Sequence, residues 1–322
     1  MSVRKKIFLM LLATLGLLLA VEYLVHRLLI FPSYAALERA DARRQLDRVI
    51  EAIEREAVHL DTIAHDWGSW DDMAAYMKSG AETFIETNLG PTVFVDNRLD
   101  FVQLADTRGR VVWQSAVDRS TGENTVLRGL PGDRYSPDHI LVSQHPAATP
   151  LEKRSVRGIM ILDGRPALIA SRPILTSENE GPIRGTIILG RYLDPPYVRV
   201  LAEMTHVSFD IAVPAAPAAG TEDHGPADEE VTIEPAGGGK LAARTLLADI
   251  AGHPAVEVVA YHPRSVTAQG WRTILFSLAV TAAACLVLFL ILRAAVCRIL
   301  LRPLTILTRE IKKVYTEDDY TP

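Results

Sequence analysis

Two long apolar segments, one near each end of the chain, constrain its fold more than any other feature. The second is an uncharged run of twenty residues between Arg272 and Arg293. At about 1.5 Å of rise per residue, such a helix matches a hydrocarbon core about 30 Å thick. The first begins after Lys6, and it extends to Val25 if Glu22 lies at the membrane interface. The pattern predicts transmembrane helices within residues 1–31 and over residues 271–293.

Basic residues beside these segments predict how the chain crosses the membrane. Residues 4–6 are all basic, and six further Lys and Arg residues lie between Arg293 and Lys313. Because basic residues next to a span stay in the cytoplasm, we expect both termini there. Residues 32–270 would then lie outside, in the periplasm if the membrane is a bacterial inner membrane. A cleavable signal peptide is the alternative for the first segment, but no small-residue cleavage site follows Ala20.

The predicted outer segment is acidic and contains no cysteine. Between residues 28 and 270 there are 34 acidic and 23 basic residues, a net charge of −11. This charge argues against nucleic acid as a partner. Both cysteines, Cys285 and Cys297, lie in or beside the second apolar segment. A hydrophobic core rather than disulfides must therefore hold the outer segment together.

Hydrophobic periodicity predicts an α+β fold for residues 32–270. Apolar residues recur at three- and four-residue steps over residues 35–65, which is typical of one long stalk helix. Short helices follow, and then paired runs of β-forming residues separated by turn signals indicate an antiparallel sheet of the PAS or Cache kind. We expect further helices over residues 136–145 and 195–205. Residues 214–240, rich in Pro, Ala, Gly and acidic residues, predict an insertion loop.

The segment Asp66-Trp-Gly-Ser-Trp-Asp-Asp72 resembles the signature of the fourth class of CHASE domains, which are extracytoplasmic sensors. The likeness continues with Tyr76, Phe84-Ile85 and Asn88-Leu89, and it covers about residues 40–265. Gly68 replaces the usual Ala of the signature. The resemblance implies a sensor domain in a membrane-bound signalling protein.

The C-terminal residues 294–322 resemble the beginning of a HAMP linker. Arg302, Pro303 and Leu304 match its early proline, and apolar residues follow at heptad-like spacing. A complete HAMP domain needs a second helix, so we expect the chain to be a fragment or a truncated product. By resemblance, the output beyond such a linker is most often a diguanylate cyclase or phosphodiesterase, and next most often a histidine kinase.

Five residues of the CHASE-like segment are candidates for ligand binding or signalling: Asp66, Trp67, Trp70, Asp71 and Asp72. Tryptophan faces can hold a cation or an apolar group, and carboxylates can fix an amine. The structural interpretation is that the tryptophans anchor the stalk helix and that Asp71 or Asp72 caps a helix. Both interpretations hold if the motif transmits changes in a pocket to the stalk.

Arg172 and Arg191 are further candidates, because an arginine at a strand end can bind a carboxylate ligand. Pairing with a nearby acidic residue is the alternative. The sequence shows no nucleophile–base constellation, no metal-ligand spacing and no phosphate-binding glycine loop, so we expect neither catalysis nor a cofactor or metal.

These observations predict a transmembrane sensor. A small ligand of unknown identity would shift the stalk relative to the second span, and HAMP would relay the motion in a parallel homodimer. An anchored extracytoplasmic enzyme and a membrane-anchored module that binds a partner protein are the alternatives. An enclosed, lined pocket would favour the sensor over the partner-binding module.

Overall fold

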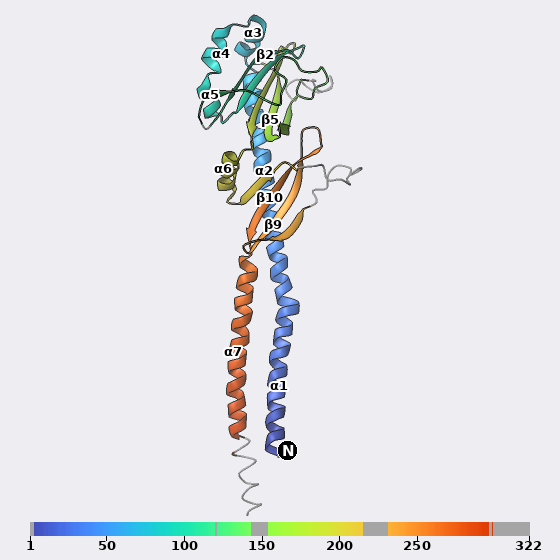
Figure 1. The fold of residues 1–322 in the computed structure, drawn as a ribbon, viewed down its shortest axis with the longest axis vertical. Coiled ribbons are helices and arrows are strands. Elements are labelled where there is room, and N and C mark those ends of the chain that lie inside the picture. Colours follow the sequence, from blue (N-terminus) through green and yellow to red (C-terminus); the bar gives the residue numbers. More distant parts are fainter. Residues whose placement is uncertain (1–2, 120, 143–153, 215–230, 296–297, 299–322) are drawn as a thin grey trace, which may run out of the picture. The chain divides into compact units, whose positions relative to one another are not determined.

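The computed structural model describes residues 3–119, 121–142, 154–214, 231–295 and 298. They form two compact units (Figure 1). The terminal unit comprises Met1–Arg39 and Arg264–Pro322, and the central unit comprises Ala40–Pro263. Arg302, Pro303 and Leu304, the predicted HAMP residues, lie outside the described residues.

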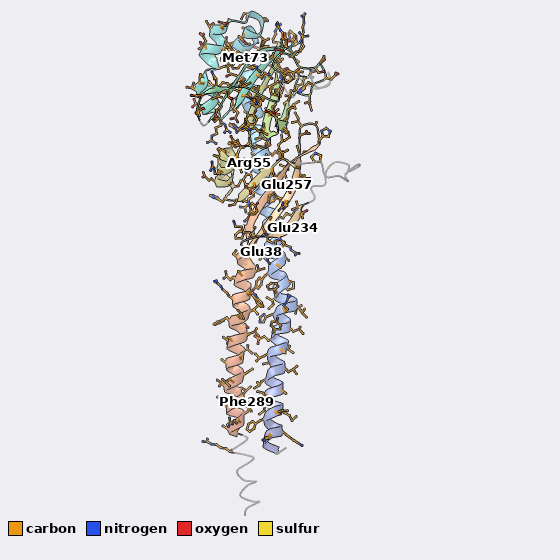
Figure 2. The ribbon with its side chains drawn as sticks, in the orientation of Figure 1. Glu38, Arg55, Met73, Glu234, Glu257 and Phe289 are labelled. Carbon is orange, nitrogen blue, oxygen red and sulfur yellow. The ribbon has the colours of Figure 1, made fainter. Side chains whose placement is uncertain are left out.

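Helices make up the described part of the terminal unit: α1 (Val3–Val25), the π-helical turn η1 (His26–Ile30), the beginning of α2 (Phe31–Gly68) and α7 (Ser265–Ala295). The α1–η1–α2 stretch and α7 are long and apolar enough to cross a membrane. Aromatic rings contact each other between them, Phe8 with Phe289 at 6.1 Å and Phe31 with Trp271 at 5.9 Å. Figure 2 labels Phe289 on α7. A side chain at Gly270 would meet the Tyr34 ring at 2.5 Å, so Gly270 permits the close approach of α7 to α2.

Helix α2 also supplies one wall of the central unit, as the stalk periodicity predicts. Its apolar stripe is buried through Leu46, Val49, Ile53 and Leu60. Three short helices follow: α3 (Asp71–Ser79), α4 (Glu82–Asn88) and α5 (Pro91–Asp96). Gly80 ends α3 in the left-handed region at φ 66°, a conformation that glycine adopts without steric cost.

Six strands form the first antiparallel sheet, in the order β3-β2-β1-β6-β5-β4. They are β1 (Phe101–Asp106), β2 (Val111–Val117), β3 (Asn124–Thr125), β4 (Val156–Leu162), β5 (Arg165–Ile174) and β6 (Gly185–Tyr192). Alternate residues of β1 face opposite sides, so Val102 and Leu104 join the core formed with α2–α5, whereas Phe101 and Ala105 join a second core. That second core is closed by Leu130, Tyr135 and Leu141. The helix predicted over 136–145 is wrong for residues 136–142, which form turns.

A second, four-stranded sheet has the order β7-β10-β9-β8. It follows α6 (Pro195–Thr205), which coincides with the predicted helix, and contains β7 (Ser208–Ala212), β8 (Thr232–Ala236), β9 (Lys240–Ala248) and β10 (Pro254–Pro263). In each sheet the first strand pairs with the last. Strand β8 lies within the predicted loop 214–240, because Thr232 and Ile233 pair with β9. The α+β class with a long helix and antiparallel strands is confirmed, and the division into two sheets is a feature that the sequence analysis does not predict.

Candidate functional site

The two tryptophans of the predicted motif lie at the end of α2, half-buried against the main core of the central unit. The Trp70 ring lies 5.4 Å from that of Phe84, which stacks on Tyr76 at 5.1 Å. Neither Trp67 nor Trp70 lines any of the three pockets described below. Their contacts agree with the anchoring interpretation of the tryptophans.

The rest of the motif holds the connection between β5 and β6. The Ser69 hydroxyl donates to Asn179 Oδ1 at 2.6 Å, and Asp71 exchanges two hydrogen bonds with Ser177. The Leu175 N–H donates to the Gly68 carbonyl at 2.8 Å. The backbone and side-chain hydrogen bonds from Ser177 lower the pKa of Asp71, because they favour the ionised carboxylate. Asp71 is the first residue of α3, and Trp70 occupies the N-cap position, so the carboxylate fixes a loop rather than capping its helix.

A close approach explains the glycine in the motif. A Cβ atom on Gly68 would lie 2.9 Å from the Pro173 carbonyl oxygen and 3.4 Å from Ile187. The usual alanine would therefore need β5 to move away from α2. Asp66 and Asp72 are exposed, and their side chains form no hydrogen bond or ion pair with another described residue. The structure thus brings only part of the predicted motif into one contact region.

Arg172 pairs with a carboxylate on the stalk helix. Its Nε and Nη2 atoms donate to the two oxygens of Asp61 at 2.7 and 2.6 Å, a bidentate geometry. Arg157 of β4 approaches the same carboxylate at 3.4 Å. Asp61 is buried on the inner side of α2, so this cluster fastens β4 and β5 to the stalk.

Arg191 is the largest fully buried side chain among the described residues. Its guanidinium donates to Glu56 at 2.5 Å, to the Tyr197 hydroxyl at 2.6 Å and to the carbonyls of Asn97 and Arg98 at 2.8 Å. The Tyr197 hydroxyl donates to the same Glu56 oxygen at 2.5 Å. Because protein groups already occupy these donors, Arg191 joins α2, β6 and α6 instead of facing a ligand.

Burial changes the ionisation of this network. It raises the pKa of Tyr197 to about 12, although the Arg191 charge acts in the opposite direction. Burial also raises the pKa of Asp100, against the influence of Arg119, whose guanidinium lies 2.7 Å away. Arg119 reaches Asp194 as well, at 3.3 Å. Tyr197 is therefore a neutral hydrogen-bond donor at physiological pH.

Sequence reasoning missed the two carboxylates that hold these arginines. Glu56 and Asp61 stand among the apolar positions Ile53, Ala57 and Leu60 of the stalk pattern. An acidic residue on the apolar face of a helix is costly unless it is paired, and that is the signal that would have identified them.

A third carboxylate lies in the terminal unit. Glu22 of α1 accepts hydrogen bonds from the hydroxyls of Ser277 at 2.8 Å and Thr281 at 3.1 Å on α7. Its other oxygen and Nδ1 of His26 are buried without a partner among the described residues. Glu22 therefore makes a polar contact between two apolar helices.

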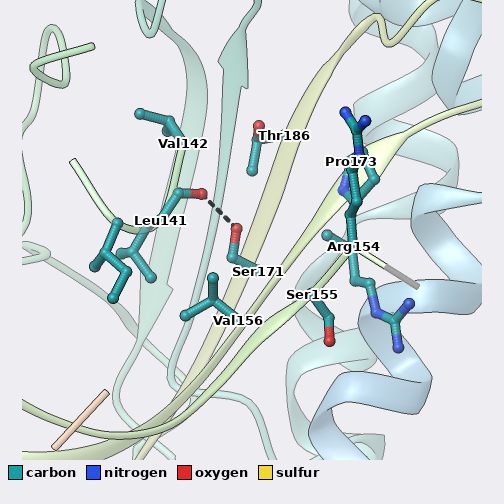
Figure 3. A pocket seen from close by; sticks show the side chains of 10 residues that line it. Leu141, Val142, Arg154, Ser155, Val156, Ser171, Pro173 and Thr186 are labelled. Carbon is teal, nitrogen blue, oxygen red and sulfur yellow. Dashed lines mark hydrogen bonds between the residues drawn. The ribbon is translucent and has the colours of Figure 1, made fainter. Parts of the chain in front are cut away.

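Described residues of the central unit line several concave regions, of which three matter here. The first, lined by Leu141, Ser155, Ser171 and Thr186, has a volume of only about 20 Å³, and the Ser171 hydroxyl donates to the Leu141 carbonyl across it (Figure 3). That volume suits about one water molecule. The second, about 610 Å³, is an apolar groove between α2 and β4. The third, about 590 Å³, lies beside α5, β2 and α6. The described residues contain no group of three or more His, Cys, Asp or Glu placed to hold a metal ion.

A known signalling protein is similar to this chain over most of this chain's length. The methanogenesis regulatory histidine kinase FilI of Methanothrix harundinacea (strain 6Ac) is 25% identical over 238 residues, which cover 74% of this chain and 26% of the kinase. The chain thus spans about a quarter of that relative's length.

Solved structures with a similar arrangement have low sequence identity. A domain assigned to the sensory box/GGDEF family, from Vibrio parahaemolyticus, is 11% identical, with a TM-score of 0.48, and the match covers 73% of this chain and 99% of that one. The sensor domain of the V. cholerae histidine kinase DctB is 13% identical, with a TM-score of 0.39, covering 72% and 98%. Both TM-scores are below 0.5.

The profile of one domain family, the CHASE4 domain, matches residues 52–212. This range is half of the chain, and it contains the tryptophan motif, the whole six-stranded sheet and α6. The chain therefore belongs to the CHASE4 domain family and is the sensor portion of a membrane signalling receptor.

Proposed function

We propose that this chain detects a small molecule outside the cytoplasm and passes the signal through its apolar helices to a cytoplasmic output. The observation that carries the proposal is the double role of α2. Its first residues belong to the terminal unit, and its later residues form the core of the CHASE4 domain. The chain is helical from α1 through η1 into α2, so no loop interrupts the path from domain to apolar segment.

The proposed orientation places both termini in the cytoplasm of an inner membrane and residues 32–270 in the periplasm. The basic residues that flank the two apolar segments support it. Single cysteines test it after Cys285 and Cys297 are replaced by serine. A membrane-impermeant maleimide applied to whole cells should label Glu178→Cys, which is exposed on the β5–β6 connection, and should spare Lys5→Cys. Labelling of Lys5→Cys but not of Glu178→Cys would show the opposite orientation.

For the output, we propose a HAMP linker followed by a module for cyclic di-GMP synthesis or hydrolysis, as the resemblance implies. A histidine kinase is the second candidate, and the kinase name of the 25% identical relative favours it. Sequencing the gene beyond residue 322 decides between them.

We also propose a parallel homodimer. The apolar groove of about 610 Å³ beside α2, lined by Ile50, Ile53, Ala57 and Ile159, supports a contact with a second copy. Disulfide trapping between Ile50→Cys chains in native membranes tests it, with Arg48→Cys, on another face of α2, as the control. No enrichment of dimers at Ile50→Cys over Arg48→Cys would contradict the proposal.

A further inference from the structure

The pocket of about 590 Å³ beside α6 lies apart from the tryptophan motif and from Arg172 and Arg191, none of which lines it. It is lined by parts of α5, β2 and α6 and by the ends of β5 and β6. Val95, Val126, Arg165, Tyr192, Asp194 and Tyr197 are the lining residues that matter for its chemistry.

Arg165 is a cation that stacks on an aromatic ring and has no acidic partner among the described residues. Its guanidinium carbon lies over the Tyr192 ring, 3.8 Å from the ring centre, which is the geometry of a cation–π contact. No carboxylate of the described residues forms an ion pair with it. Stacking fixes the plane but leaves the N–H donors at its edge available, and this fork matches a carboxylate.

Another part of the pocket lining is apolar. Val95 is 54% exposed and Val126 is 75% exposed, and both line this pocket. Leu127 and Val200 continue the apolar lining. A ligand with a hydrocarbon body would remove these side chains from water.

The charge of the lining selects a singly charged ligand. Arg98, Arg119 and Arg165 are balanced by three aspartates, and Arg119 already holds Asp100 and Asp194. A multiply charged anion would meet those carboxylates, whereas a monoanion needs only one free guanidinium. We infer that this pocket binds a small monocarboxylate with an apolar body, its carboxylate on Arg165 and its hydrocarbon part on Val95 and Val126.

The pocket is also connected to the stalk. Asp194 caps α6 by accepting from the Tyr197 N–H at 2.9 Å, and the Tyr197 hydroxyl reaches Glu56 of α2. A ligand that moves the beginning of α6 would therefore act on α2. This part of the inference rests on the proposed sensor function, whereas binding itself does not.

Calorimetric titration of the full chain in lipid nanodiscs tests the binding. The probes are butyrate, hexanoate and phenylacetate, with phenethylamine and phenylethanol as matched controls, each to about 10 mM, where Kd values near 10 mM remain visible. We expect the carboxylates to bind and the two controls not to bind. Arg165→Gln should weaken binding at least about tenfold, because a charge-assisted hydrogen bond is lost. Arg199→Gln, on an exposed α6 residue outside the pocket, should leave it unchanged.

Binding at this pocket and the proposed sensor function are tested by different measurements. Absence of carboxylate binding, equal binding of phenylethanol, or equal weakening by Arg165→Gln and Arg199→Gln would overturn the inference in a chain that still melts like the parent. The sensor function would then stand or fall on the orientation and output experiments. Carboxylate binding that survives Val126→Asp would overturn the assignment of the hydrocarbon part to this wall.

Discussion

The terminal and central units hold their buried carboxylates in different ways. In the central unit, Glu56 and Asp61 pair with arginines of β6, β5 and β4. In the described part of the terminal unit, Glu22 accepts from two hydroxyls, and Nε2 of His26 lies 3.7 Å from its Oε1. Glu38 accepts from the Thr267 hydroxyl at 2.8 Å and from its N–H at 3.1 Å, near the beginning of α7, while Arg264 lies farther away at 3.5 Å.

An arginine partner and a hydroxyl partner give a buried carboxylate contacts of different strength. An arginine pair surrounded by protein is costly to separate, because either partner alone is a buried charge. A carboxyl that accepts from neutral hydroxyls loses little when one helix shifts, because each hydrogen bond contributes little and exchanges easily. The arginine pairs of Glu56 and Asp61 should therefore be costly to separate, and the hydroxyl contacts of Glu22 should be easier to exchange.

The largest effect should come from Glu56→Ala. It leaves Arg191, which is 1% exposed, without its carboxylate, and we expect the free energy of unfolding to fall by ~3–5 kcal/mol. Urea unfolding followed by circular dichroism measures the change. Glu51→Ala is the control, because its pair with Arg55 is exposed and should contribute only ~0.3–0.5 kcal/mol. Equal effects of the two substitutions would remove the basis of the comparison.

Asp61→Ala should destabilise less, by ~1–3 kcal/mol. One of its partners, Arg157, is 44% exposed and can turn to water, whereas Arg172 is only 14% exposed. The same urea titration measures the loss. Arg157→Gln should have a smaller effect than Arg172→Gln, and the reverse order would show that the bidentate pair is not the main contact.

Glu22→Leu should have a small effect on the association of α1 with α7, about 0.6 kcal/mol for a hydrogen bond between membrane helices. A double-mutant cycle with Ser277→Ala in lipid bilayers measures the coupling between the two side chains. A second cycle, with Thr281→Ala in place of Ser277→Ala, measures the coupling of Glu22 with the other hydroxyl. A coupling as large as the Glu56–Arg191 interaction would mean that the terminal unit is locked as firmly as the central unit.

Asp71 belongs to the central unit, but its carboxylate accepts from the neutral donor Ser177 and not from an arginine. It therefore tests whether the kind of donor, rather than the unit, sets the strength of a carboxylate contact. Its pKa is lowered, so its contribution to stability is present above the unfolded value near 3.8 and is lost as the pH falls through the lower folded value. Asp71→Asn should flatten the acid limb of a thermal-melting profile slightly. The adjacent exposed Asp72→Asn should not, and an equal change in both would exclude the Ser177 contact as the cause.

Periodicity and turn signals were sufficient to predict α2, α6 and the hairpin strands, because these elements depend on local residues. The division into two sheets was not predictable, since strand order depends on contacts between residues far apart in the sequence. The predicted residues Trp67 and Trp70 pack against the same core, but Arg172 and Arg191 belong to two separate clusters. Their partners Asp61 and Glu56 lie about 110 and 135 positions away, beyond the reach of local patterns.

The π-helical turn η1, His26–Ile30, changes which residues of α1 and α2 lie on the same face of the continuous helix. A turn with i→i+5 hydrogen bonds holds about one residue more than an α-helical turn, and one residue corresponds to about 100° around the axis. A single helical wheel drawn from α1 into α2 therefore assigns the wrong faces after Ile30. A cysteine-accessibility scan along this helix should show its period broken between residues 26 and 30, and deleting one residue there should restore one continuous period.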